Sequence, residues 1–548
     1  MLAKLQRFRA SNLDQVFSDR VNKWIMVTLT LIFASAALSA ASAAFFYPLE
    51  IETRESTAWL AVLALRAGIN IYDQSQVVFV NLNHGPFDPL LKSAIAISFP
   101  FLESWQVTRF PVFILPYLFL LLAWKMIGIS SVGSFMRVLF LGSIGYLFLV
   151  VAAKEFLFVG RSDATVAVLL LILLYISNSS SAETIPVTTL HGFLSGLVAT
   201  LVTLTNWRTG PTAIAILLLT FWQLRTARQA SLRLTGVYIG SCAIAAVITF
   251  GLMLYHVSNL NLSVYYQHFF GFYSNDAGWS TGESYNGPVF TFLLSLFNLT
   301  ASPGSLKGGP VLLALFTCAL VLSKSGLVNK RNNAWLILAS STFAFCAGAY
   351  YLNYWGGGSW YFIPFVIILW CFLCSNYLNM SQARLNLLGM FVLALLCINF
   401  RTVIAPTISR VSTIRQAQTF MARVRLLQEK SSVLSEDTFF FRTRYSGELI
   451  DMGDVVSVFA KSAYFNGDFK QTVKRHFEQV RINPPDYIVT GFTESPELRV
   501  LIKEKYVLIA SGPANFTANG GGESKLFVRK DLKIGDGIVQ VGGGAFRQ

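Results

Sequence analysis

Charged residues are scarce in this chain: Asp, Glu, Lys and Arg make up only 13% of its 548 residues, whereas 54% are hydrophobic. This balance argues against a soluble globular domain, whose surface needs more charge. Apolar runs of about 18 residues recur along most of the chain, which is near the length that an α-helix needs to cross a bilayer. The sequence therefore predicts a polytopic α-helical membrane protein.

Cysteine and histidine are also few, with six and five residues. All cysteines lie in apolar segments, so neither a disulfide framework nor a metal knuckle is expected, and the CxxC of Cys371 and Cys374 is better explained by helix packing. No histidine has the i, i+4 partner of a zinc site. The Walker loop, the Rossmann fingerprint and the G-x-S-x-G motif are absent too, which argues against ATP-driven transport and serine hydrolysis.

The formal net charge of +15 is not an indication of nucleic-acid binding. Much of the Lys and Arg lies in short loops between apolar segments, where it reports orientation and contact with anionic headgroups. The loops that include the N-terminus carry most of it, so they are predicted to be cytoplasmic. Membrane lipids, and not nucleic acid, are the expected partners.

Eleven apolar windows predict about eleven transmembrane helices. They are 24–46, 110–124, 138–153, 164–176, 188–204, 212–222, 234–254, 310–322, 335–352, 361–374 and 385–400. An odd number of crossings places the C-terminus outside the cell.

Two domains are expected. Residues 1–400 form a transmembrane domain with large outer loops at 47–109 and 256–309. Residues 401–548 form an extracytoplasmic α/β domain, because "DYIVTGF", "KYVLIAS" and "SKLFVRK" alternate as strands do.

Three carboxylates, Glu50, Glu52 and Glu55, follow the first apolar window directly. A carboxylate beside low-dielectric surroundings has a raised proton affinity, which suits a general base near neutral pH. Equally, these acids are explained as solvated charges at the start of an interfacial helix, where they complement the helix dipole. Both explanations stay open at this point.

Further candidates lie in the outer loops. Tyr72, His84 and Asp88 surround a Gly-Pro turn in a mixture suited to binding a sugar, although an ordinary turn would look similar. Arg161 could bind a phosphate bidentately, and Asp163 could bind a divalent ion or orient the acceptor. Alternatively, the two residues form only an ion pair at the membrane interface. The remaining outer-loop candidates for substrate binding are Arg208, His268 and Lys307.

Taken together, "IETRESTAWLAVLALRAG", the aromatic Gly-Pro turn, the "GR-x-D-A" of residues 160–164 and the glycine-rich "NYWGGGSWYFIP" resemble the GT-C superfamily of integral membrane glycosyltransferases. The resemblance covers roughly residues 24–374. The Asp-Glu pair usual in the family is replaced here by Ile51 and Glu52, which leaves open which glutamate matches the family's catalytic carboxylate.

The resemblance implies an inverting transferase that moves a sugar from a polyprenyl-phosphate-linked donor to an envelope acceptor, which would be a lipid, a glycan or a protein. Glu52 would be the base, with Glu50 and Glu55 as fallbacks, and Asp163 its assistant. Arg161, Arg208 and Lys307 would hold the phosphate. Some relatives need a divalent cation and others do not, so Mg²⁺ or Mn²⁺ held by Asp163 and Glu52 stays open. The implied location is the bacterial inner membrane, with the periplasm on the outer side.

Two other functions fit the composition. A lipid-linked sugar flippase or secondary transporter would want ionisable groups near the bilayer midplane, whereas the acids here lie mostly at helix ends. A non-enzymatic envelope-assembly protein would use the C-terminal domain for docking.

Overall fold

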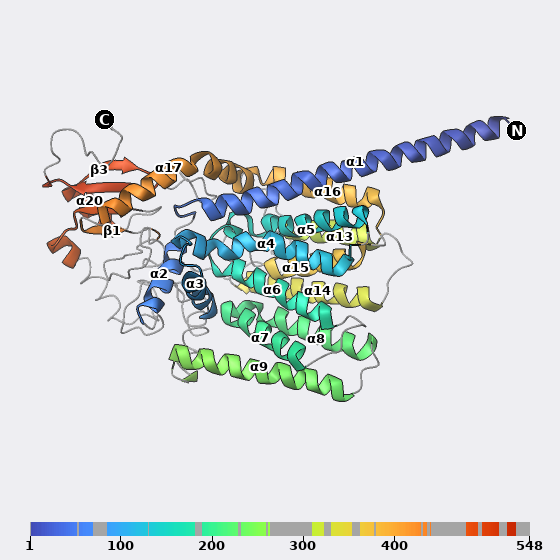
Figure 1. Cartoon of the computed structure of the whole chain (residues 1–548), viewed down its shortest axis with the longest axis horizontal. Helices are drawn as coiled ribbons and strands as arrows, with labels where there is room; N and C mark the ends of the chain where they lie inside the picture. Colours follow the sequence, from blue (N-terminus) through green and yellow to red (C-terminus); the bar gives the residue numbers. More distant parts are fainter. Residues whose placement is uncertain are drawn as a thin grey trace.

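The computed structural model is a bundle of long helices with a small sheet at one end (Figure 1). It describes residues 2–51, 54–68, 85–129, 131–180, 189–227, 232–258, 261–262, 309–322, 330–352, 362–377, 380–428, 431–435, 439, 478–490, 496–513 and 523–532.

A helix overlaps each of the eleven predicted windows, so the helical part of the prediction is confirmed. These helices are α1 (Leu2–Phe46), α4 (Ser104–Ile127), α5 (Val132–Ala153), α6 (Ser162–Ser180), α7 (Thr189–Thr205), α8 (Gly210–Ala227), α9 (Leu232–Ser258), α13 (Gly309–Leu322), α14 (Lys330–Leu352), α15 (Ile363–Ser375) and α16 (Gln382–Ile398). Two short helices, α2 (Arg54–Arg66) and α3 (Phe87–Ser98), lie between α1 and α4 at the end of the bundle nearest the sheet (Figure 1).

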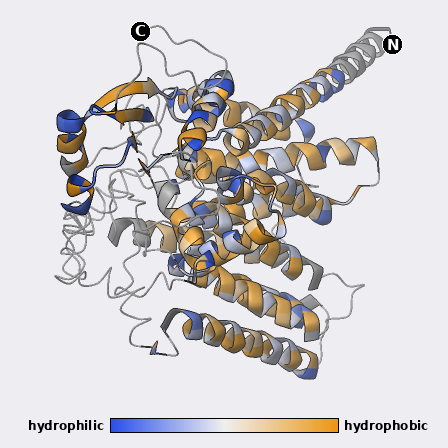
Figure 2. Ribbon diagram, turned by 60° about the vertical axis from the view of Figure 1, so that its left-hand side comes forward, coloured by the Kyte–Doolittle hydropathy of each residue, from blue (hydrophilic) through white to orange (hydrophobic). Residues whose placement is uncertain are grey.

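Among the described residues, four helices are long and apolar enough to cross a membrane by themselves: 19–46, 104–127, 132–153 and 233–256. A bent pair formed by α16 and the segment after it brings this to five, and five further apolar helices have 10–17 residues. Hydrophobic residues cover the bundle along most of its length (Figure 2). The chain is therefore an integral membrane protein.

Helices α4, α5 and α15 form the centre of the bundle. The indole of Trp370 on α15 donates a hydrogen bond of 2.7 Å to the carbonyl oxygen of Leu141 on α5, and its ring meets Phe119 of α4 edge to face at 4.8 Å. Trp370 and Phe119 are both buried. A buried indole N–H needs such a partner, so this bond fixes the depth at which α15 enters the bundle.

After α16 the chain bends by 76° and leaves the bundle. A π-helical turn, Phe400–Ile404, leads into α17 (Ala405–Gln428), which runs to the sheet (Figure 1). At the bend, the backbone N–H and the side-chain amide of the buried Asn399 both donate to the carbonyl oxygen of Leu395, at 3.0 and 2.9 Å. The π-turn is thus the local cause of the bend.

The sheet has the strand order β1-β2-β4-β3. The strands are β1 (Val433–Ser435), β2 (Tyr487–Thr490), β3 (Tyr506–Ser511) and β4 (Lys525–Arg529), and α20 (Pro496–Lys505) precedes β3. β1 pairs with β2 in parallel, and the other two pairs are antiparallel. The three predicted strands are confirmed as β2, β3 and β4.

The sheet lies against the helix ends. Gly512, directly after β3, is so close to Leu49 and to Phe420 of α17 that an added Cβ would lie 3.2 Å from Leu49 Cδ1. The Ser104 hydroxyl at the start of α4 donates 2.6 Å to the carbonyl of Phe439. These contacts attach the C-terminal part to the segment that carries the glutamates.

Candidate functional site

The glutamates after α1 are buried in the protein. The chain leaves α1 at Phe46, and Glu50 is 3% exposed while Glu55, in the first turn of α2, is fully buried. For these two residues, the alternative explanation as solvated charges does not hold. Glu52 lies outside the described residues.

Glu55 forms a buried ion pair with Arg109 of α4. Arg109 Nε donates 2.7 Å to Oε1 of Glu55, and Nη2 donates 2.6 Å to Oε2, a bidentate geometry. The other guanidinium donors bind the backbone carbonyls of Ala44, Tyr47 and Leu49. Arg109 therefore uses all five donors to hold the chain between α1 and α2.

Both oxygens of Glu55 are also saturated. Oε2 accepts the backbone N–H of Ile51 at 2.6 Å, and Oε1 accepts the backbone N–H of Gly160 at 2.7 Å. With two hydrogen bonds on each oxygen, this carboxylate has no lone pair directed at a substrate. The contact with Gly160 joins the start of α2 to the turn before α6.

A second buried ion pair approaches Gly160 from the other side. Lys92 of α3 is fully buried, and its Nζ lies 2.6 Å from Oδ2 of Asp88 and 2.7 Å from the carbonyl oxygen of Gly160. The other oxygen of Asp88 accepts the hydroxyl of Thr165 in α6 at 2.5 Å. Asp88 was predicted to bind substrate; here its charge is paired inside the protein.

Arg161 and Asp163 lie between these contacts. Both are largely buried, at 8% and 7% exposure, and Arg161 Nε is 3.4 Å from Oδ2 of Asp163. Asp163 lies in the first turn of α6, where its charge suits the helix dipole. The pair therefore sits at a helix N-terminus, the backbone position that favours anions.

Arg208 lies in the turn that follows α7. The backbone N–H of Gly85, just before α3, donates 3.0 Å to the carbonyl oxygen of Thr205 at the end of α7. A short 3₁₀ helix follows (Trp207–Thr209), and the Arg208 guanidinium lies 5.8 Å from the Trp207 ring. Arg208 is thus on the same end of the bundle as α3.

The contacts through Gly160 and Thr165 bring together four predicted site residues: Glu55, Asp88, Arg161 and Asp163. Glu50 is buried in the segment before α2, and Arg208 lies in the turn after α7. The others, Glu52, Tyr72, His84, His268 and Lys307, lie outside the described residues. Arg109, Lys92 and Thr165 were missed. A signal for Lys92 was present, since Asp88 and Lys92 are spaced i, i+4, whereas nothing in the sequence links Glu55 to Arg109.

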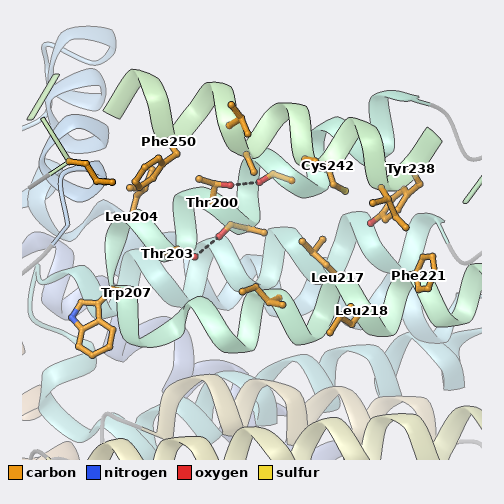
Figure 3. A pocket seen from close by; sticks show the side chains of 18 residues that line it. Thr200, Thr203, Leu204, Trp207, Leu217, Leu218, Phe221, Tyr238, Cys242 and Phe250 are labelled. Carbon is orange, nitrogen blue, oxygen red and sulfur yellow. Dashed lines mark hydrogen bonds between the residues drawn. The ribbon is translucent and has the colours of Figure 1, made fainter. Parts of the chain in front are cut away.

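An apolar groove of about 870 Å³ lies between α7, α8 and α9. Leu204 and Trp207 lie at one end, and Phe221 and Tyr238 at the other (Figure 3). From Tyr238 to Phe250 the groove follows α9 over roughly 18 Å, at 1.5 Å of rise per residue. Its Leu204 end adjoins Gly85, whose Cβ position would overlap the Leu204 carbonyl.

A divalent-cation site is not assembled by the part of the chain that the structure describes. No three His, Cys, Asp or Glu side chains gather there, and the charged neighbour of Asp163 is Arg161. A guanidinium beside Asp163 would repel a cation. Glu52, the other predicted ligand, lies outside the described residues, so a divalent cation stays a prediction.

Solved structures of membrane transferases are similar to this chain in fold. ArnT from Cupriavidus metallidurans bound to undecaprenyl phosphate has a TM-score of 0.52 at 12% identity, covering 92% of this chain and 97% of that chain. The apo state of ArnT gives 0.41 at 11% identity, covering 93% and 98%. The apo oligosaccharyltransferase of Archaeoglobus fulgidus gives 0.37 at 12%, covering 94% and 75%. No family model and no curated protein matches the chain. At 12% identity the likeness to the first of these structures is one of fold, and it agrees with the fold that the resemblance to the GT-C superfamily predicts.

Proposed function

We propose that this chain, a membrane protein with the GT-C fold, is an inverting glycosyltransferase. It moves a sugar from a polyprenyl-phosphate-linked donor to an envelope acceptor on the outer face of the membrane. The observation that carries the proposal is the joining of two distant segments: the acidic stretch after α1 and the Arg161–Asp163 turn are held together by buried ion pairs at one end of the bundle.

The reaction is a single displacement at the anomeric carbon. A carboxylate accepts the proton of the acceptor hydroxyl while the hydroxyl oxygen bonds to that carbon, and the polyprenyl phosphate leaves with the electron pair of the broken C–O bond. Negative charge grows on the phosphate, so Arg161, assisted by Arg208 and Lys307, would stabilise the transition state.

The base is assigned to Glu52 or Glu50. Glu55 would not be the base, because both of its oxygens already accept hydrogen bonds from Arg109, Ile51 and Gly160. Glu50 is buried. The residue before it, Leu49, accepts a hydrogen bond from Arg109 through its backbone carbonyl. Asp163 would orient Arg161 through the contact of 3.4 Å between them.

The groove between α7, α8 and α9 would take the prenyl chain of the donor. Its lining is almost wholly apolar, and its Leu204 end adjoins Gly85, three residues before Asp88. A chain lying there would keep its tail in hydrocarbon and bring its phosphate toward Arg208 and Arg161, at the depth where the headgroup plane lies. The sugar would then face the acidic segment.

The location proposed is the bacterial inner membrane, with the helix end that bears the site facing outward. Residues 1–400 would be the catalytic membrane domain and residues 401–548 a periplasmic domain. This direction agrees with the basic loops on the N-terminal side.

The test is a transfer assay with the purified full chain in proteoliposomes. A panel of undecaprenyl-phosphate-linked sugars, radiolabelled in the sugar, would be offered with an envelope extract of the organism that makes the chain. Appearance of label in an acceptor together with free undecaprenyl phosphate is expected. Movement of intact donor across the bilayer without product would instead identify a flippase.

A further inference from the structure

We propose that the two buried ion pairs form a clamp on Gly160 whose purpose is to set the position of Arg161, so that Lys92 and Glu55 are positioning residues for phosphate binding. This inference rests on the proposed function. Neither Lys92 nor Glu55 would touch the substrate; each would act through the backbone that carries Arg161.

The clamp holds both sides of one residue. The carboxylate of Glu55 accepts the N–H of Gly160 at 2.7 Å, and the ammonium of Lys92 donates to its C=O at 2.7 Å. Each clamping group is held in turn by a charged partner, Arg109 or Asp88. Gly160 therefore cannot move without breaking a charge-assisted hydrogen bond.

The chain beyond Arg161 is held by the same group. Asp88, the partner of Lys92, accepts the hydroxyl of Thr165 at 2.5 Å. One ion pair on α3 thus holds the residue before Arg161 and a residue in the first turns of α6. The Asp88–Lys92 pair therefore contacts the chain on both sides of Arg161, at Gly160 and at Thr165.

Gly160 also has no room to shift toward α4. A Cβ at this position would lie 2.2 Å from Cγ2 of Thr108 and 3.0 Å from its carbonyl oxygen. The next N–H, that of Arg161, donates 2.7 Å to the carbonyl of Val159, which closes the turn tightly. The turn is confined by packing on one side and by ion pairs on the other.

Stability alone is a poor reason for two such pairs. Removing charges from water is costly, and a buried ion pair is often no better for stability than apolar side chains of the same volume. The two ion pairs instead fix the position of the backbone that carries the Arg161 side chain. A displacement of about 1 Å in a substrate-positioning group can lower a rate by about 10²-fold.

The experiment compares two double variants of the full chain that differ in a single hydrogen bond. Asp88→Asn with Lys92→Gln, and Asp88→Asn with Lys92→Met, both remove the ion pair and leave no buried unpaired charge. Glutamine keeps an N–H donor for the Gly160 carbonyl, one bond nearer the backbone than the lysine ammonium, whereas methionine of the same length has no donor. The variants are placed in nanodiscs, and their affinity for undecaprenyl phosphate and their melting temperatures are measured.

The Met variant is expected to bind undecaprenyl phosphate about tenfold more weakly than the Gln variant at the same melting temperature. Glu103→Gln, which breaks the partly exposed pair with Arg425 and removes no contact to Gly160, is the control and should bind as the wild type does. Equal affinity of the two double variants overturns the clamp. A loss of affinity that only follows a lower melting temperature overturns it as well.

Hydrogen exchange separates this inference from the proposed function. Amides of residues 157–165 should exchange faster in the Met variant than in the Gln variant, whether or not Arg161 binds phosphate; equal exchange would refute the clamp. Arg161→Gln tests the function by itself: if it binds undecaprenyl phosphate as tightly as the wild type, Arg161 is not the phosphate ligand.

Discussion

The guanidinium of Arg109 forms a bidentate pair with the carboxylate of Glu55, with Nε–Oε1 and Nη2–Oε2 distances of 2.7 and 2.6 Å, and neither side chain is exposed. The same guanidinium holds three carbonyls of the segment from Ala44 to Leu49. This one pair therefore fixes where the acidic segment leaves α1. Glu55, which the sequence offers as a catalytic acid or base, instead holds the backbone around the site in place.

Glu55→Gln should destabilise the protein strongly. The change leaves the Arg109 cation buried without its counter-charge, and breaking one side of a buried pair costs about 3–5 kcal/mol. Unfolding of the purified protein in mixed micelles, followed against denaturant, measures this loss. The matched control is Glu103→Gln, whose pair with Arg425 is 26% exposed on both sides and should cost at most about 1 kcal/mol. Similar losses for both variants would contradict the structural role of Glu55.

Gly160→Ala should also destabilise, by about 1–3 kcal/mol, because the new methyl group would meet Cγ2 of Thr108 at 2.2 Å. Thr108→Ser removes that Cγ2 but keeps the hydroxyl that donates 2.8 Å to the Ser104 carbonyl. The double variant should therefore recover part of the lost stability. A double-mutant cycle measures the coupling, and strictly additive effects would mean that the two residues do not touch.

Ala246→Trp should weaken binding of undecaprenyl phosphate. Ala246 lines the groove between α7, α8 and α9, and an indole there would occupy the space proposed for the prenyl chain. A loss of about tenfold, equal to ~1.4 kcal/mol, is expected in nanodisc binding assays. Ile248→Trp is the control, since Ile248 lies on the same helix, is 48% exposed and does not line the groove. Equal effects of the two changes would place the lipid elsewhere.

The helices could be predicted because each apolar window carries its own signal. The run that contains Ile144, for example, needs no distant partner to be recognised as a helix that enters hydrocarbon. The ends were less certain: α4 begins at Ser104, six residues before its window, because "SWQVTR" is too polar to be counted as apolar. The short β1 carries too few residues to show an alternation, so it was not predicted.

The site was predictable only in part. The acids and the GR-x-D-A turn stand out as polar residues at the ends of apolar runs. Which of them are paired depends on contacts over long separations, such as Glu55 with Arg109 and with Gly160. No local pattern encodes these contacts. The sequence therefore predicted polar residues at the ends of apolar helices, and it could not separate Glu55, which holds the backbone, from the other glutamates.

Replacement of the glutamates one at a time tests the central claim most directly. Wild type, Glu50→Gln and Glu52→Gln would be compared in proteoliposomes by the rate at which free undecaprenyl phosphate is released from a sugar-linked donor in the presence of envelope acceptors. Loss of the proton acceptor should slow one of the two variants by about 10²–10⁴-fold while donor binding and folding are kept. Full activity in both variants would contradict a base in this segment, and with it the proposed mechanism.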